Sequence, residues 1–136
     1  MQFEQDYVMR LIKQVIHALI GTLLNKKTTM EYDMLANRQN RSGEDHLRKL
    51  TMLADQGKIC EAENMLLESL EGESDEAYRT ALLFYEHINE FDEDFLEEHN
   101  FSRAEIRQGV LNVADRMGKY PIAASVLSDD IAEGLF

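Results

Sequence analysis

The sequence predicts an all-α protein built from stacked antiparallel helical hairpins, and two observations support this prediction. Apolar residues recur at helical spacing along most of the 136 residues, and no segment favours strands. A glycine-lysine helix opening also occurs twice, as Gly57-Lys58 and again as Gly118-Lys119. A small alanine and then a leucine follow each opening: Ala62 and Leu66, then Ala123 and Leu127. This order is typical of the second helix of a packed hairpin.

Length and composition indicate one globular domain over residues 1–136. We expect an N-terminal arm over residues 1–41 and a helical-hairpin body over residues 42–136. The composition is ordinary for a folded protein, with 44% hydrophobic and 29% charged residues. The net charge is −12, and residues 51–136 carry the acidic excess. This charge disfavours nucleic acid and favours a basic protein or peptide as the partner.

The longest stretch without Asp, Glu, Lys or Arg is Gln14–Asn25. It is shorter than the roughly 20 residues that span a bilayer, and the features of a signal peptide are missing. We therefore expect a cytoplasmic protein without stable membrane insertion. The single cysteine agrees with a reducing compartment, and Cys60 is predicted to be a small core residue.

The first predicted helix covers Phe3–Leu24, where apolar residues come as adjacent pairs four positions apart. Its apolar face is too wide for one neighbouring helix, so we predict a homodimer through this helix. Gly21 costs about 1 kcal/mol relative to alanine in a helix, which indicates the close approach of another helix. The dimer-interface candidates are Tyr7, Val8, Leu11, Ile12, Val15 and Leu19.

The middle of the chain continues in short helical segments. We expect a short helix over Thr28–Asn37, followed by a loop over Asn37–Gly43. A helix then begins at Ser42 or Gly43, with carboxylates in its first turn, and ends at Gly57. The next helix, Ile59–Leu70, returns antiparallel to it.

The remaining helices have clear start signals. Ser74 is predicted to cap a helix over Asp75–Phe91, and a short acidic helix or turn follows over Asp92–Glu98. Ser102 and Glu105 form a capping box, which opens the next helix. The last predicted helix carries a proline in its first turn and continues to the final residues.

The two hairpin signatures resemble the second half of a tetratricopeptide repeat. Each copy has a small residue at the expected helix crossing and a leucine below it: Leu53, Gly57, Ile59, Ala62 and Leu66, then Ala114, Gly118, Tyr120, Ala123 and Leu127. The resemblance implies a right-handed α-α superhelix that carries a long N-terminal amphipathic helix. Both copies depart from the family, since its tryptophan and closing proline are missing and the repeat length exceeds about 34 residues.

The opening Phe3-Glu4-Gln5-Asp6-Tyr7-Val8-Met9-Arg10 resembles the start of a small family of uncharacterised proteins from Gram-positive bacteria. This likeness extends to the capping box at Ser102. It implies a bacterial cytoplasmic protein and no particular activity.

The densest group of ionisable residues lies in Glu86–His99, where two histidines stand among seven acidic residues. His87 and Glu90 share a helical face and are weak metal-site candidates. No metalloprotease motif, calcium loop or phosphate-binding loop occurs, and the serines lie at caps or on helix surfaces. We therefore expect no cofactor and no enzymatic activity.

Two functions of different classes remain. The first is a protein-interaction or scaffold module that binds a basic protein or peptide. Its partner-binding candidates are Asp92, Glu93, Asp94, Glu97 and Glu98. The alternative is a helical bundle that binds a metal or a small ligand in the acidic region from His87 to His99.

Overall fold

The computed structural model describes residues 2–25 and 44–127, and the secondary structure in this part of the chain is entirely helical. The all-α class and the long N-terminal helix are therefore confirmed. The predicted short helix at Thr28–Asn37, the loop at Asn37–Gly43 and the end of the last helix lie outside the described residues. The helices are α1 (Gln2–Asn25), a helix over residues 44–55, α3 (Ile59–Leu70), α4 (Asp75–Asn89), α5 (Glu93–Glu98), α6 (Arg103–Arg116) and α7 (Tyr120–Leu127).

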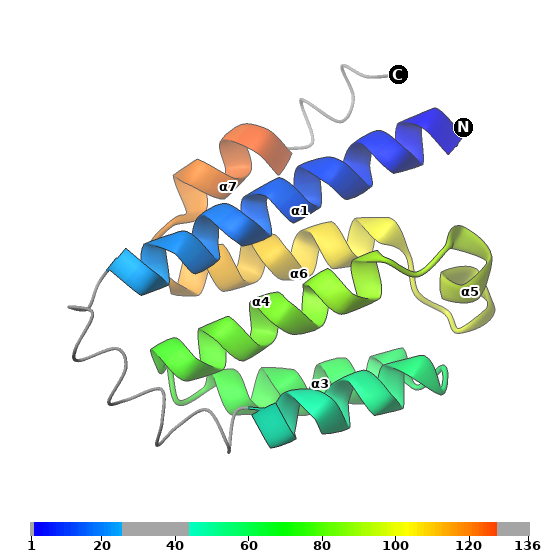
Figure 1. Ribbon diagram of the computed structural model, residues 1–136, viewed down its shortest axis with the longest axis horizontal. Coiled ribbons are helices and arrows are strands. Elements are labelled where there is room, and N and C mark those ends of the chain that lie inside the picture. Colours follow the sequence, from blue (N-terminus) through cyan, green and yellow to red (C-terminus); the bar gives the residue numbers. More distant parts are fainter. Residues whose placement is uncertain (1, 26–43, 128–136) are drawn as a thin grey trace.

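The long helices form two layers (Figure 1). Helix 44–55, α4 and α1 lie in front, and α3, α6 and α7 lie behind them. Each front helix runs antiparallel to the helix behind it, so the body consists of three stacked antiparallel pairs. The first two pairs follow the chain, because helix 44–55 is joined to α3 by a short turn and α4 precedes α6.

The third pair joins two helices that are far apart in the sequence, α1 and α7. α1 packs against α4, α6 and α7, and it runs opposite to α4 (Figure 1). Its broad apolar face is therefore covered within one chain, and Ile12, Val15 and Leu19 belong to the common core. This corrects the prediction that these three residues lie in a dimer interface. Three neighbouring helices of the same chain cover the wide apolar face that we assigned to a second copy.

The two glycine-lysine turns have the same geometry. Gly57 has φ +90° and Gly118 has φ +75°, values at which a glycine ends a helix without steric cost. The Lys58 N–H donates to the Leu53 carbonyl at 2.9 Å, and the Lys119 N–H donates to the Ala114 carbonyl at 2.7 Å. The structure thus places the repeated signature at two equivalent turns. The alanines that follow, at positions 62 and 123, are both fully buried.

The predicted helix starts are confirmed by their caps. The Ser74 hydroxyl accepts a hydrogen bond from the Ala77 N–H, and the Ser102 hydroxyl accepts one from the Glu105 N–H. The Asp92 carboxylate caps α5 in the same way. α4 ends at Asn89, slightly before the predicted Phe91.

A buried arginine ties the ends of three helices together. Only 4% of the Arg103 side chain is exposed at the start of α6. Its guanidinium donates to the Asn89 and Phe91 carbonyls at 2.6 and 2.7 Å, and to the Glu93 carboxylate at 2.7 Å. The Asn89 amide in turn donates to the Met9 carbonyl at 3.0 Å. These bonds fix the position of α5 relative to α1, α4 and α6.

α4 and α6 cross closely at a glycine. A Cβ atom on Gly109 would lie 2.4 Å from the ring of Tyr85, so no larger residue fits without a shift of this buried ring or of the helices. The Tyr85 hydroxyl reaches past this crossing and donates to the Glu63 carboxylate on α3 at 2.8 Å.

None of the helices in the described part of the chain could span a bilayer.

Candidate functional site

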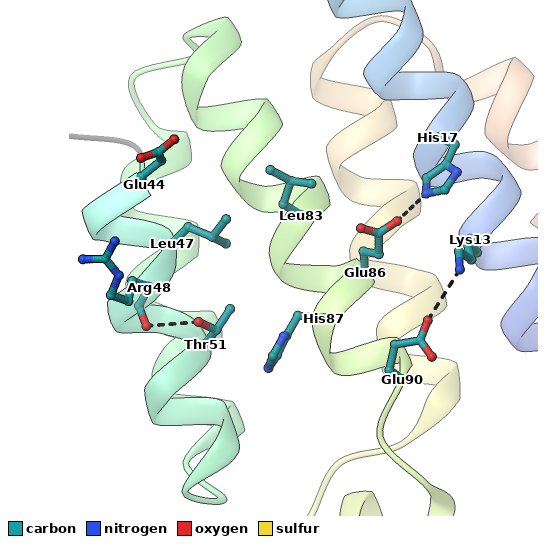
Figure 2. Close-up of a pocket in the computed structure, with 10 residues that line it drawn as sticks. All are labelled: Lys13, His17, Glu44, Leu47, Arg48, Thr51, Leu83, Glu86, His87 and Glu90. Carbon is teal, nitrogen blue, oxygen red and sulfur yellow. Dashed lines mark hydrogen bonds and ion pairs between the residues drawn. The ribbon is translucent and has the colours of Figure 1, made fainter. Parts of the chain in front are cut away.

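An open groove of about 800 Å³ lies on the front layer between helix 44–55 and α4 (Figure 2). Leu47 and Leu83 contribute apolar side chains from the two helices, and Thr51 adds a hydroxyl group. Both leucines are half-buried, since the gap between the helices leaves them in contact with solvent. The groove therefore combines a small apolar surface with access from outside.

Charged side chains surround this apolar surface. On one side, α1 and α4 are joined by a contact between His17 and Glu86 and by the Lys13–Glu90 ion pair at 3.8 Å (Figure 2). On the other side, helix 44–55 presents Glu44 and Arg48. The Lys13–Glu90 pair is at least half exposed on both sides and contributes little to stability. Its charges remain accessible to a partner.

A ladder of four aromatic rings begins at His87, one of the residues that line the groove. His87, Phe91, Phe95 and His99 are spaced four residues apart in the sequence, and their ring centroids are 5.5, 4.6 and 4.4 Å apart in that order. The first ring bonds to helix 44–55, because His87 Nε2 lies 2.7 Å from the Asp55 carboxylate. The ladder continues through the break between α4 and α5 and holds the short helix against the body.

The last ring of the ladder packs on the first glycine-lysine turn. The His99 ring donates from Nδ1 to the Phe95 carbonyl at 2.8 Å, which directs its other nitrogen towards Gly57. A Cβ atom on Gly57 would lie 2.2 Å from this nitrogen. Gly57 is thus required twice, for its positive φ and for the space that the imidazole fills.

The acidic partner-binding candidates divide into two groups. Asp92 caps α5 and Glu93 binds Arg103, so these two carboxylates have structural roles. Asp94, Glu97 and Glu98 are exposed on α5. Accordingly, the structure leaves three of the five predicted residues as an accessible acidic surface on α5.

The weak metal candidates do not converge. His87 faces Asp55 on helix 44–55, whereas Glu90 faces Lys13 on α1. Across residues 2–25 and 44–127, no three His, Cys, Asp or Glu side chains are grouped so that they could hold a metal ion. The i,i+3 spacing predicted one shared helical face, but Glu90 follows the last residue of α4, and the two side chains have different partners.

The remaining dimer candidates lie at the edge of α1. Tyr7 is exposed, and Val8 and Leu11 are half-buried against the core. These three residues are still available to a partner, unlike the three candidates in the core.

Cys60 is exposed, which corrects its predicted place in the core. It follows Ile59, the residue that faces inward, and its Sγ atom lies 4.0 Å from the Asn100 carbonyl. Partial desolvation raises the pKa of its thiol, and the carboxylates of Glu105 and Glu63 add to the rise. A raised pKa lowers the thiolate fraction, which is the reverse of what a nucleophilic cysteine needs.

Among the described Asp and Glu side chains, only Glu63 on α3 has a clearly shifted pKa. Burial raises the pKa of its carboxyl, the hydrogen bond from Tyr85 opposes this rise, and the charge of Glu105 adds to it. Burial also raises the pKa of the Tyr85 hydroxyl, and the Glu63 carboxylate strengthens the effect. The hydrogen bond between Tyr85 and the partly buried Glu63 joins α4 to α3, which is a structural role.

The groove residues were missed in the sequence because they depend on which helices share the front layer. A visible signal did exist for the ladder, since four rings recur at every fourth position from residue 87. No motif marked Arg103 as buried, because it follows a cap residue and reads as an ordinary surface charge.

The fold and the site define a two-layer helical protein with an open groove. The chain belongs to the family of unknown function DUF6483, which it matches over residues 2–118. No curated protein matches the chain, and no solved structure matches it either.

Proposed function

We propose that this protein is a non-enzymatic interaction module whose groove binds a segment of a basic protein. The observation that carries the proposal is the open groove itself, with Leu47 and Leu83 as its apolar surface. An apolar side chain of the partner gains by leaving water there, at about 25 cal/mol for each Å² buried.

Charge supports a basic partner. The chain carries a net charge of −12, and Asp94, Glu97 and Glu98 are exposed on α5, the helix that follows the groove residues His87 and Glu90 in the chain. Exposed charges of one sign attract a partner of the opposite sign and accelerate its association. In this arrangement the acidic surface attracts the partner and the apolar groove holds it.

The expected setting follows from the resemblance of the opening segment. We expect a cytoplasmic protein of a Gram-positive bacterium, in which the chain acts as an adaptor or scaffold.

The proposal is tested with the full chain as bait in extracts of the cells that make it. One variant carries Leu47→Gln and Leu83→Gln, and a second carries Asp94→Lys, Glu97→Lys and Glu98→Lys. The matched control reverses three exposed charges on the other side of the body: Glu61→Lys, Glu68→Lys and Glu71→Lys. Quantitative mass spectrometry compares the retained proteins.

We expect at least one protein that the wild type and the control retain and that both test variants lose by about tenfold or more, which is 1.4 kcal/mol of binding free energy. Its retention should also fall at high salt, because exposed charges are screened within about 8 Å at physiological ionic strength. If the groove variant and the control retain the same proteins in equal amounts, the groove is not the binding site.

A further inference from the structure

The two ends of the helical stack differ in charge. At one end, helix 44–55 and α3 expose acidic and basic residues, including Asp45, Lys49 and Glu68. At the other end, α7 contains no charged residue, and the outer edge of α1 contains none from Tyr7 to Thr22. Stacked helical proteins need a polar outer face at each end to stay apart in water. The outer face at the α1/α7 end of the described chain carries polar residues such as Gln14 and Ser125 but no charged residue.

Helical spacing defines this end. Tyr7, Leu11, Gln14 and Ala18 follow one another at intervals of four, three and four residues, so they share one edge of α1. Lys13 and His17 face the groove beside α4, on another side of the same helix (Figure 2). We call the edge from Tyr7 to Ala18, together with Ile122 and Val126 on α7, the end face.

The end face exposes apolar surface. The exposed fractions are 41% for Tyr7 and 48% for Ile122, and Leu11 and Val126 are half-buried. An α-helix of 24 residues is about 36 Å long. This length is comparable to the width of a patch of the roughly 800 Å² that each partner contributes to a standard interface.

Gly21, three residues after Ala18 on α1, provides a further argument for a neighbour on this side. A Cβ atom on Gly21 would meet nothing within 4 Å, so no neighbour in the described chain requires a glycine there. Glycine within a helix costs about 1 kcal/mol relative to alanine. A second helix that approaches α1 closely from outside gives this glycine a packing reason.

We propose that the end face binds a second copy of this chain, so that two stacks join at α1 and α7 into a symmetric dimer. Two chains that each carry a charge of −12 repel each other over most of their surfaces. Contact through an uncharged face avoids both this repulsion and the cost of desolvating charges. The end face therefore lets two copies meet without placing like charges against each other.

The test measures mass in solution by light scattering and sedimentation between about 5 and 200 µM, with the full chain. The wild type should have twice the 15.7 kDa of one chain. Ala18→Glu and Ile122→Glu each place a charge on the end face, and each should raise the dissociation constant by more than about tenfold. The control is Met52→Glu at the charged end, where the exposed fraction is 55%. It should remain a dimer.

A wild type that stays at 15.7 kDa throughout this range overturns the proposal. So does a dimer that both end-face variants leave unchanged. A monomeric wild type whose melting temperature falls with Ala18→Glu would instead assign the end face to residues 128–136 of the same chain. The groove variant, the α5 charge-reversal variant and their α3 control should all remain dimers, which separates this proposal from the proposed partner binding.

Discussion

The guanidinium of Arg103 donates hydrogen bonds to both oxygen atoms of Asn89, the main-chain carbonyl at 2.6 Å and the side-chain carbonyl at 3.2 Å. The carbonyl belongs to the last residue of α4, where no further helical turn satisfies it. Arg103 therefore acts as a cap for α4 from the start of another helix. Because the same guanidinium binds Phe91 and Glu93, it also sets the turn that leads into α5.

Replacing Arg103 with methionine should lower the free energy of unfolding by about 2–4 kcal/mol, because buried acceptors lose a charged donor. Arg103→Lys should recover only a small part, since an ammonium group cannot reach all the acceptors of the planar fork. Urea denaturation measures both. Arg48→Met is the control, because its ion pair with Asp45 is exposed and its loss should change stability by less than about 0.5 kcal/mol. Equal effects at the two arginines would contradict the structural role of Arg103.

Two helical glycines should respond in opposite directions to alanine. Gly109→Ala forces a methyl group against the Tyr85 ring and should cost about 1–3 kcal/mol. Within one chain Gly21→Ala meets open space, so in the Ile122→Glu background, which weakens the proposed dimer, it should stabilise the fold by up to about 1 kcal/mol through helix propensity. Thermal and urea unfolding of the two variants decide the matter. A stabilising Gly109→Ala would mean that α4 and α6 do not cross at this point.

The raised pKa of Glu63 predicts a pH dependence. A carboxyl with a folded pKa above its ordinary 4.5 binds more protons in the folded state. Its contribution to stability is therefore most favourable near pH 4 and declines as the pH rises through the folded pKa. Glu63→Gln keeps an oxygen acceptor for Tyr85 and removes this titration. The variant should gain stability over the wild type between pH 4 and pH 8.

The measurement is the difference in unfolding free energy between Glu63→Gln and the wild type at several pH values. Glu61→Gln, an exposed neighbour on α3, is the control and should show a flat difference. If the Glu63 difference is also flat, the Glu63 carboxyl is not desolvated in the folded chain.

Metal removal should leave the fold unchanged. His87 and Glu90 are directed to separate helices, so a chelator should not shift the melting temperature, and added Zn²⁺ or Mn²⁺ should not raise it. His87→Ala should cost about 1 kcal/mol through the lost ring contact and the bond to Asp55, with or without metal. A metal-dependent increase in melting temperature that disappears in His87→Ala would restore the alternative function.

Local signals explain why most of the helices could be predicted. Caps at Ser74 and Ser102 and turn glycines at Gly57 and Gly118 act within a few residues, so the sequence shows them directly. The position of α1 depends on packing against α4, α6 and α7, which begin about 50 to 95 residues after α1 ends. Its wide apolar face had two explanations, a second copy or several neighbours in one chain, and periodicity cannot distinguish between them.

The site was less predictable for the same reason. The acidic segment stood out by composition, yet its carboxylates differ in role, because Asp92 and Glu93 are used by the fold. The apolar groove contains ordinary leucines whose exposure depends on the distance between two helices. Only a three-dimensional arrangement reveals it.

The pairing of α1 with α7, which are far apart in the sequence, has a consequence for protein synthesis. α1 leaves the ribosome before α4, α6 and α7, the helices that cover its apolar face. At about 5–20 residues per second, α7 appears on the order of 10 s after α1. During this interval the nascent α1 exposes the residues that later form the core, and it is a natural substrate for chaperones. Slow docking of α7 would prolong this exposure. Newly made chains would then aggregate, whereas the mature fold would be unaffected.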